Sequence, residues 1–302
     1  MMAARTHWIN TDEFYREIIA APDSVTRERL YRERFIRPWK PMMDMLAPMF
    51  HADPSDDLAV ARAWAWLLPD DLTETPDALR KLEAADAWTV AARALAEGAA
   101  QFDGYADRLP IESVEGWLVI ANPARADPIG RGYTGGIDFT QPRLIAQFDT
   151  PNDTNLPRLP GLVAHELHHV IHLRVFPWNM ATTSVADYIV HEGMAESFAA
   201  ALYGADSVGY YVTEFDESEL ATAKALIGAG LDKTGFDVIR AHIFGDHFAE
   251  QFGLPKIGMP AFGGYAIGYR VVQAYLNRTG QSVADATFVP AGEIVRESGF
   301  FS

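Results

Sequence analysis

The most constraining feature of this chain is an uninterrupted run, LVAHELHHVIHLRVF, over residues 162–176. Apolar residues and histidines recur in it at helical spacing, and Pro177 marks the place where a helix has to end. The run contains the H-E-x-x-H motif His165-Glu166-Leu167-His168-His169. Four residues turn a helix through about 400°, so His165 and His169 project from one face about 6 Å apart along the axis.

Two imidazoles placed in this way can hold one zinc ion, and the helical context gives the short motif its meaning. Glu166 lies one residue further round the helix, where a carboxylate can act as general base without occupying a coordination position. The competing interpretations are a chance match, or a histidine-rich face with loose metal affinity. His168 and His172 are expected to be packing residues or to support the ligands rather than to bind metal.

A catalytic zinc site needs a third protein ligand and an open position, and Glu192 is the candidate. It follows His169 by 23 residues, which allows the chain to reverse after Pro177 and return as a second helix. Glu196 lies one turn further along the same face, where it can accept an N–H from a ligand histidine. A solvated acidic edge is the alternative for both glutamates, and His191 is a weaker rival ligand.

Three further groups of residues are candidates for a role in the site. Tyr265 and Tyr269 share a helical face, and either of them or Arg270 could stabilise an oxyanion, with a buried aromatic stripe as the equal alternative. Gly193 removes a side chain where helices and a metal crowd together. Gly135 and Gly136 belong to a strand edge that could accept an extended peptide, or to a hairpin turn, which is the simpler interpretation.

The order of elements predicts an α+β architecture, mostly helical, with a small sheet before the H-E-x-x-H helix. Helical patterns fill residues 11–109, beginning with Thr11 as a candidate N-cap. Short strands are expected between 112 and 149, and helices over VADYIVHEGMAESFAAALYG, ESELATAKALIGAGL and GGYAIGYRVVQAYLN. We expect an N-terminal helical lobe over 1–110 and a catalytic region over 111–302, joined as one integrated unit.

Composition narrows the possible partners. Lys and Arg number 25 against 41 Asp and Glu, a net charge of −16 that disfavours nucleic acid and anionic membranes as ligands. The chain has no cysteine, so a metal must use histidine and carboxylate ligands. No apolar run reaches the length of a membrane span and no secretion signal is evident, so we expect a cytoplasmic protein whose oligomeric state is undetermined.

Together, HELHHV, EGMAE and GGYAIGYRVV resemble the YjaZ-type family of zinc-dependent proteases, which are related to the gluzincins. The resemblance covers roughly residues 132–277. It implies a zincin-like fold with His165, His169 and Glu192 as zinc ligands, Glu166 as base and Glu196 behind the ligands. Tyr265, Gly268 and Tyr269 match the family's GY-x-x-GY stretch, and Tyr265 and Tyr269 are included among the candidate catalytic residues.

The leading hypothesis is a zinc metallopeptidase that acts on a peptide or protein substrate. A second hypothesis is a binding or regulatory module whose zinc site is structural or vestigial, although a structural site has no use for a base at Glu166. A third is a zinc hydrolase that acts on a non-peptide amide or ester.

Overall fold

The computed structural model describes residues 4–53, 55–179, 181–251 and 253–302. It has an α+β architecture with a small mixed sheet, as the sequence predicts. The described residues form two compact units, Met1–Asp103 with Ile111–Glu166, and Gly104–Pro110 with Leu167–Ser302. These bounds differ from the division at residue 110 expected from the order of predicted elements, and that division stays a prediction.

The sheet of the first unit has the strand order β1-β2-β4-β3, in which β1, β2 and β4 are parallel and β3 pairs with β4 antiparallel. In the described part of the chain, β3 is therefore an edge strand. The strands are β1 (Arg5–Trp8), β2 (Ser113–Ile120), β3 (Tyr133–Asp138) and β4 (Arg143–Phe148).

Strand β1 was not expected, because its four residues carry no alternating pattern of their own. It is held by packing instead. A Cβ built on Gly116 of β2 would lie 2.2 Å from the Trp8 ring, so only glycine at this position admits the indole. The N-terminal segment is thereby tied to a sheet whose other strands begin more than a hundred residues later.

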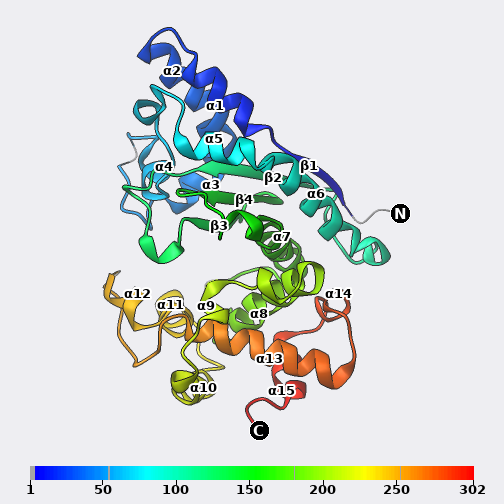
Figure 1. Ribbon diagram of the computed structural model, residues 1–302. Helices are drawn as coiled ribbons and strands as arrows, with labels where there is room; N and C mark the ends of the chain where they lie inside the picture. The colour runs from blue at the N-terminus through cyan, green and yellow to red at the C-terminus, as the bar shows by residue number, and fades with distance from the viewer. Residues whose placement is uncertain (1–3, 54, 180, 252) are drawn as a thin grey trace. The chain divides into compact units, whose positions relative to one another are not determined.

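Helices cover this sheet, and Figure 1 shows α6 beside β1 and β2. The α-helices before the sheet hairpin are α1 (Thr11–Ile19), α2 (Ser24–Tyr31), α3 (Arg37–Leu46), α4 (Ala59–Ala63), α5 (Asp77–Ala84) and α6 (Ala87–Ala100). Fully buried aromatic residues fill the core beneath them, among them Tyr15, Tyr31, Phe35, Trp39 and Trp66. These aromatic residues therefore serve packing.

The second unit is built around α8 and α13, which lie side by side in Figure 1. The helices from the metal motif onward are α7 (Leu159–Val175), α8 (Val185–Tyr203), α9 (Tyr210–Thr213), α10 (Leu220–Gly228), α11 (Phe236–Phe244), α12 (Asp246–Gln251), α13 (Gly263–Thr279), α14 (Val283–Ala286) and α15 (Ala291–Ser298). The boundary between the two units falls inside α7, which is one continuous helix. Among the described residues, no helix combines the length and apolar character needed to cross a bilayer.

Thr11 corrects one sequence expectation, because the N-cap of α1 is Asn10 and Thr11 is the first helical residue. The Thr11 side chain is fully buried. Its hydroxyl donates to the carbonyl oxygen of Leu118 in β2 and accepts the Trp88 Nε1–H at 2.8 Å. One hydroxyl thus joins α1, α6 and the sheet.

We predict that Thr11→Val destabilises the protein by about 1–3 kcal/mol, because two buried polar groups lose their partner. The measurement is urea unfolding at neutral pH. Thr89→Val is the matched control, since Thr89 is an exposed residue of α6. Equal effects of the two substitutions would show that the Thr11 hydrogen bonds contribute nothing specific.

Candidate metal centre

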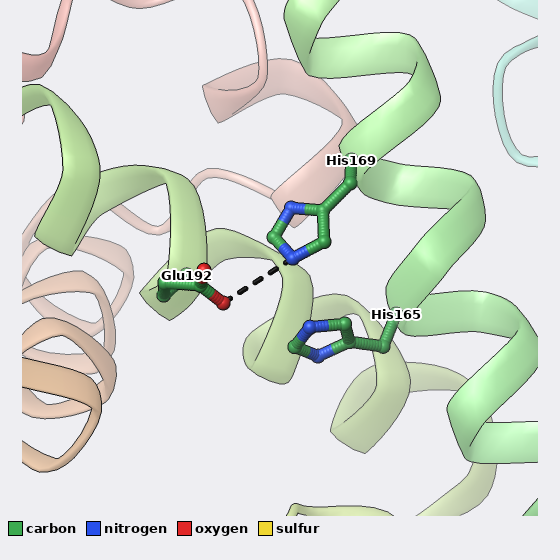
Figure 2. A group of neighbouring side chains, drawn as sticks. All are labelled: His165, His169 and Glu192. Carbon is green, nitrogen blue, oxygen red and sulfur yellow. Dashed lines mark ion pairs between the residues drawn. The ribbon is translucent and has the colours of Figure 1, made fainter. Parts of the chain in front are cut away.

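Helix α7 places the H-E-x-x-H motif in a buried position. It is apolar on nearly all sides, as expected of a helix surrounded by protein, and it ends at Val175, two residues before Pro177. His165 and His169 are each only 6% exposed. Figure 2 shows the two imidazoles projecting from successive turns of this one helix toward the same point, which is the arrangement predicted from the four-residue spacing.

Helix α8 brings Glu192 to that point. The helix begins at a capping box in which the Ser184 hydroxyl accepts the Asp187 N–H and the Asp187 carboxylate accepts the Ser184 N–H, at 3.1 and 2.8 Å. This capping box fixes the first residue of the helix. Glu192 follows two turns later and is 4% exposed. The alternative for Glu192, a solvated acidic edge, is therefore wrong.

His165, His169 and Glu192 form one buried group whose ligand atoms all lie within 4.8 Å of one another. His169 Nε2 is 3.2 Å from Glu192 Oε2 (Figure 2). Atoms about 2.1 Å from one tetrahedral zinc ion stand about 3.4 Å from each other, so the spacing fits a shared ion after small side-chain adjustments. Two imidazoles and one carboxylate are also a donor set that zinc accepts. Among the described residues, this is the group of histidine and acidic side chains able to hold a metal.

Glu166 follows His165 on α7 and lies against strand β3. It is 6% exposed, and a Cβ built on Gly135 would lie only 2.1 Å from its Oε1 atom. Gly135 and Gly136 are strand residues rather than a hairpin turn, which corrects the simpler sequence interpretation. The missing side chain of Gly135 is what leaves room for the Glu166 carboxylate.

Glu196 is 1% exposed and has partners that the sequence did not indicate. Its carboxylate accepts the Tyr211 hydroxyl at 2.5 Å and the Gly209 backbone N–H at 2.8 Å. Burial, and then the charge of Glu196, raise the pKa of Tyr211 well above its usual value, so the phenol stays protonated and donates. These contacts anchor α9 to α8. A role for Glu196 behind the ligand histidines remains a prediction.

The remaining histidines of the two helices are buried and bonded. His168 Nε2 lies 3.1 Å from the Thr287 hydroxyl, and His172 Nδ1 lies 2.9 Å from His191 Nδ1. Burial lowers the pKa of His172 from 6.5 to about 4, and it holds the pKa of His191 well below its usual value, with the neighbouring histidines adding to the effect. His191, the rival ligand considered from sequence, is outside the group that could hold a metal.

Tyr265 and Tyr269 are half-buried residues of α13. The Tyr265 ring packs on Tyr211, with centroids 4.5 Å apart, and so reaches the segment that Glu196 anchors. Burial, followed by the charge of Glu196, raises the pKa of Tyr269. Arg270 pairs with Glu217 and donates to the Ala266 carbonyl oxygen. The catalytic roles of the two tyrosines stay predictions, while the ion pair of Arg270 was not foreseen.

The glycines of GGYAIGY explain how α8 is positioned. A Cβ on Gly193 of α8 would lie 2.2 Å from the Gly268 carbonyl oxygen of α13, and a Cβ on Gly268 would lie 2.1 Å from the Ile189 carbonyl oxygen. The two helices thus touch backbone to backbone one residue from Glu192. The sequence indicated crowding at Gly193 but could not identify α13 as its source.

Comparison with known proteins agrees with this geometry. Residues 87–296 match the profile of a family described as predicted Zn-dependent proteases, and the chain belongs to this family. It is 31% identical to the uncharacterized protein YjfC of Bacillus subtilis (strain 168) over 297 residues, which cover 97% of each chain. It is 25% identical to the uncharacterized protein YjaZ of the same organism over 142 residues, which cover 46% of this chain and 51% of YjaZ. The YjaZ-type resemblance noted in the sequence is confirmed. No solved structure matches the chain.

We predict that Gly193→Ala destabilises the protein by about 1–3 kcal/mol and weakens zinc binding, because the new methyl meets backbone that cannot move aside. Gly292→Ala is the matched control, since a Cβ at this exposed helical position meets nothing within 4 Å. It should be neutral or stabilising by up to about 1 kcal/mol. Unfolding by urea and zinc titration measure the two effects. A Gly193→Ala protein as stable as the control would contradict the close helix contact.

Proposed function

We propose that the chain is a zinc-dependent metallopeptidase of the gluzincin kind with a zincin-like catalytic arrangement. His165, His169 and Glu192 hold zinc, and Glu166 is the general base. One observation carries the proposal: two histidines of an H-E-x-x-H helix meet a glutamate of a second helix in a buried group, while the motif's own glutamate stays outside that group. The family assignment supports the same chemistry.

Bound to these three side chains, zinc would polarise a scissile carbonyl and make water more acidic. Glu166 accepts the proton from the attacking water at its carboxylate and passes it to the departing amine nitrogen. Burial beside β3 holds this carboxylate in place before substrate arrives. A purely structural metal site would need no such base, which favours the enzyme over the binding or regulatory module.

Strand β3 is the proposed platform for the substrate. Its outer edge has no neighbouring strand in the described residues, so an extended peptide can add to it through backbone hydrogen bonds. Because Glu166 rests on Gly135 of this strand, a peptide on that edge passes next to the base. This placement favours a peptide bond over a non-peptide amide or ester, since a small ester has no backbone to pair with the strand.

The general base is tested by Glu166→Gln. We predict that zinc still binds with one ion per chain and that kcat/KM falls by at least about 100-fold, because the amide cannot take a proton. Digestion of a complex peptide mixture, with and without chelator, is followed by mass spectrometry. Glu219→Gln, at an exposed position, is the control and should retain full turnover.

Undiminished cleavage by Glu166→Gln would refute the role of Glu166. A wild-type protein that binds zinc but cleaves nothing in the mixture would favour the binding module. That module is supported further if zinc removal unfolds the chain, because a catalytic site tolerates an empty metal position.

The contact of Glu166 with β3 is tested by Gly135→Ala. The new methyl meets the Glu166 side chain from Cγ outward and no backbone, so we expect the carboxylate to move aside with a smaller loss of stability than a backbone collision causes. A displacement of about 1 Å at the base should lower kcat by about 100-fold with zinc affinity intact. Gly136→Ala is the control, because a Cβ there meets nothing within 4 Å. Equal kcat values for the two variants would show that Gly135 does not position the base.

A further inference from the structure

A pair of histidines outside the metal group lies against one of its members. The ring of His191 is stacked on the ring of His169, with centroids 4.0 Å apart and planes inclined by 24°. His191 comes from α8 and His169 from α7, so the contact joins the two helices that supply the candidate ligands. The stack covers one face of the His169 ring. The Nε2 atom at the edge of this ring lies 3.2 Å from Glu192 Oε2.

His191 is itself fixed in place. Its Nδ1 atom shares a hydrogen bond of 2.9 Å with Nδ1 of His172, which lies one turn beyond His168 on α7. One of these two nitrogens donates and the other accepts, so each ring determines the tautomer of the other. The ring of Tyr188 packs against His191 edge to face at 6.1 Å, and Trp178 packs on Tyr188 in turn. His191 is 7% exposed and His172 is 5% exposed.

We propose that His191, held by its hydrogen bond to His172, is a positioning residue that fixes the ring orientation of His169 for metal binding. An imidazole on a single Cβ can rotate about its terminal torsion, which has a broad energy minimum. The flat ring of His191 covers one face of the His169 ring and restricts that rotation. His169 therefore loses less conformational entropy when a metal binds. The inference rests on the proposed function, because it concerns the same metal centre.

His191 is not a catalytic residue in this scheme, since it acts only through His169. Ring stacking and general core packing predict different effects of substituting His191. A flat aromatic replacement should preserve most of the effect, whereas a branched aliphatic residue of similar bulk should lose it. Residues that orient metal ligands typically contribute 10–100-fold to metal affinity.

The test measures zinc affinity of the full chain by competition with a chromophoric chelator, and records the visible spectrum of the cobalt-substituted protein. His191→Leu should weaken zinc binding by about 10–100-fold and alter the cobalt spectrum. His191→Phe should bind zinc within a few-fold of wild type. His242→Leu is the matched control, because His242 is also buried, at 3%, but its ring bonds to the Val238 carbonyl oxygen in α11. It should leave zinc affinity unchanged.

The proposal is overturned if His191→Leu keeps wild-type affinity and spectrum, if His191→Phe is as weak as His191→Leu, or if His242→Leu loses as much affinity. Should His191→Leu fail to fold, His191→Met tests the same idea, because methionine has similar bulk without a flat ring, and unchanged zinc affinity in it would also overturn the proposal. A wild-type protein that binds no zinc would refute the proposed function instead, so the two failures are distinguishable.

Discussion

The candidate metal centre depends on how closely helix α8 can approach its neighbours. Helix α8, which supplies Glu192, lies backbone to backbone against α13, with Gly193 on Gly268 and Gly268 on Ile189. A side chain larger than hydrogen at either glycine would collide with the backbone of the other helix, and Gly193 is the residue next to Glu192. Two residues that carry no chemistry themselves thus determine how the helix that supplies Glu192 packs on α13.

Several ionisable side chains are buried around these helices, and their burial costs hydration free energy. Glu166, Glu192 and Glu196 are buried together with a set of histidines, and a buried charge needs a partner or a metal to offset its lost hydration. Glu196 is bonded to Tyr211 and Gly209, and His172 is bonded to His191. A divalent cation shared by His165, His169 and Glu192 would compensate the carboxylate that faces the two imidazoles. The burial of this carboxylate next to two imidazoles therefore favours a cation site.

The sequence predicted those parts that depend on local periodicity. The spacing of His165 and His169, the end of α7 near Pro177 and the return of the chain as a helix through Glu192 are all local properties. Other features depend on contacts between segments that are distant in the sequence. They are the hydrogen bond from Tyr211 to Glu196, the contact of Glu166 with Gly135, and strand β1. Short polar or glycine-containing stretches do not predict such contacts. Thr11 shows the same limit, since its residue type suggested a helix cap whereas its tertiary contacts bury it.

In the proposed site, two histidines and one glutamate from α7 and α8 bind a single metal ion. X-ray absorption spectroscopy on purified, zinc-supplemented protein tests it most directly, together with elemental analysis of the same sample. We expect one zinc per chain, with two imidazole ligands and oxygen ligands at about 2.0–2.2 Å. Absence of zinc after supplementation, or a coordination shell without imidazole, would contradict it.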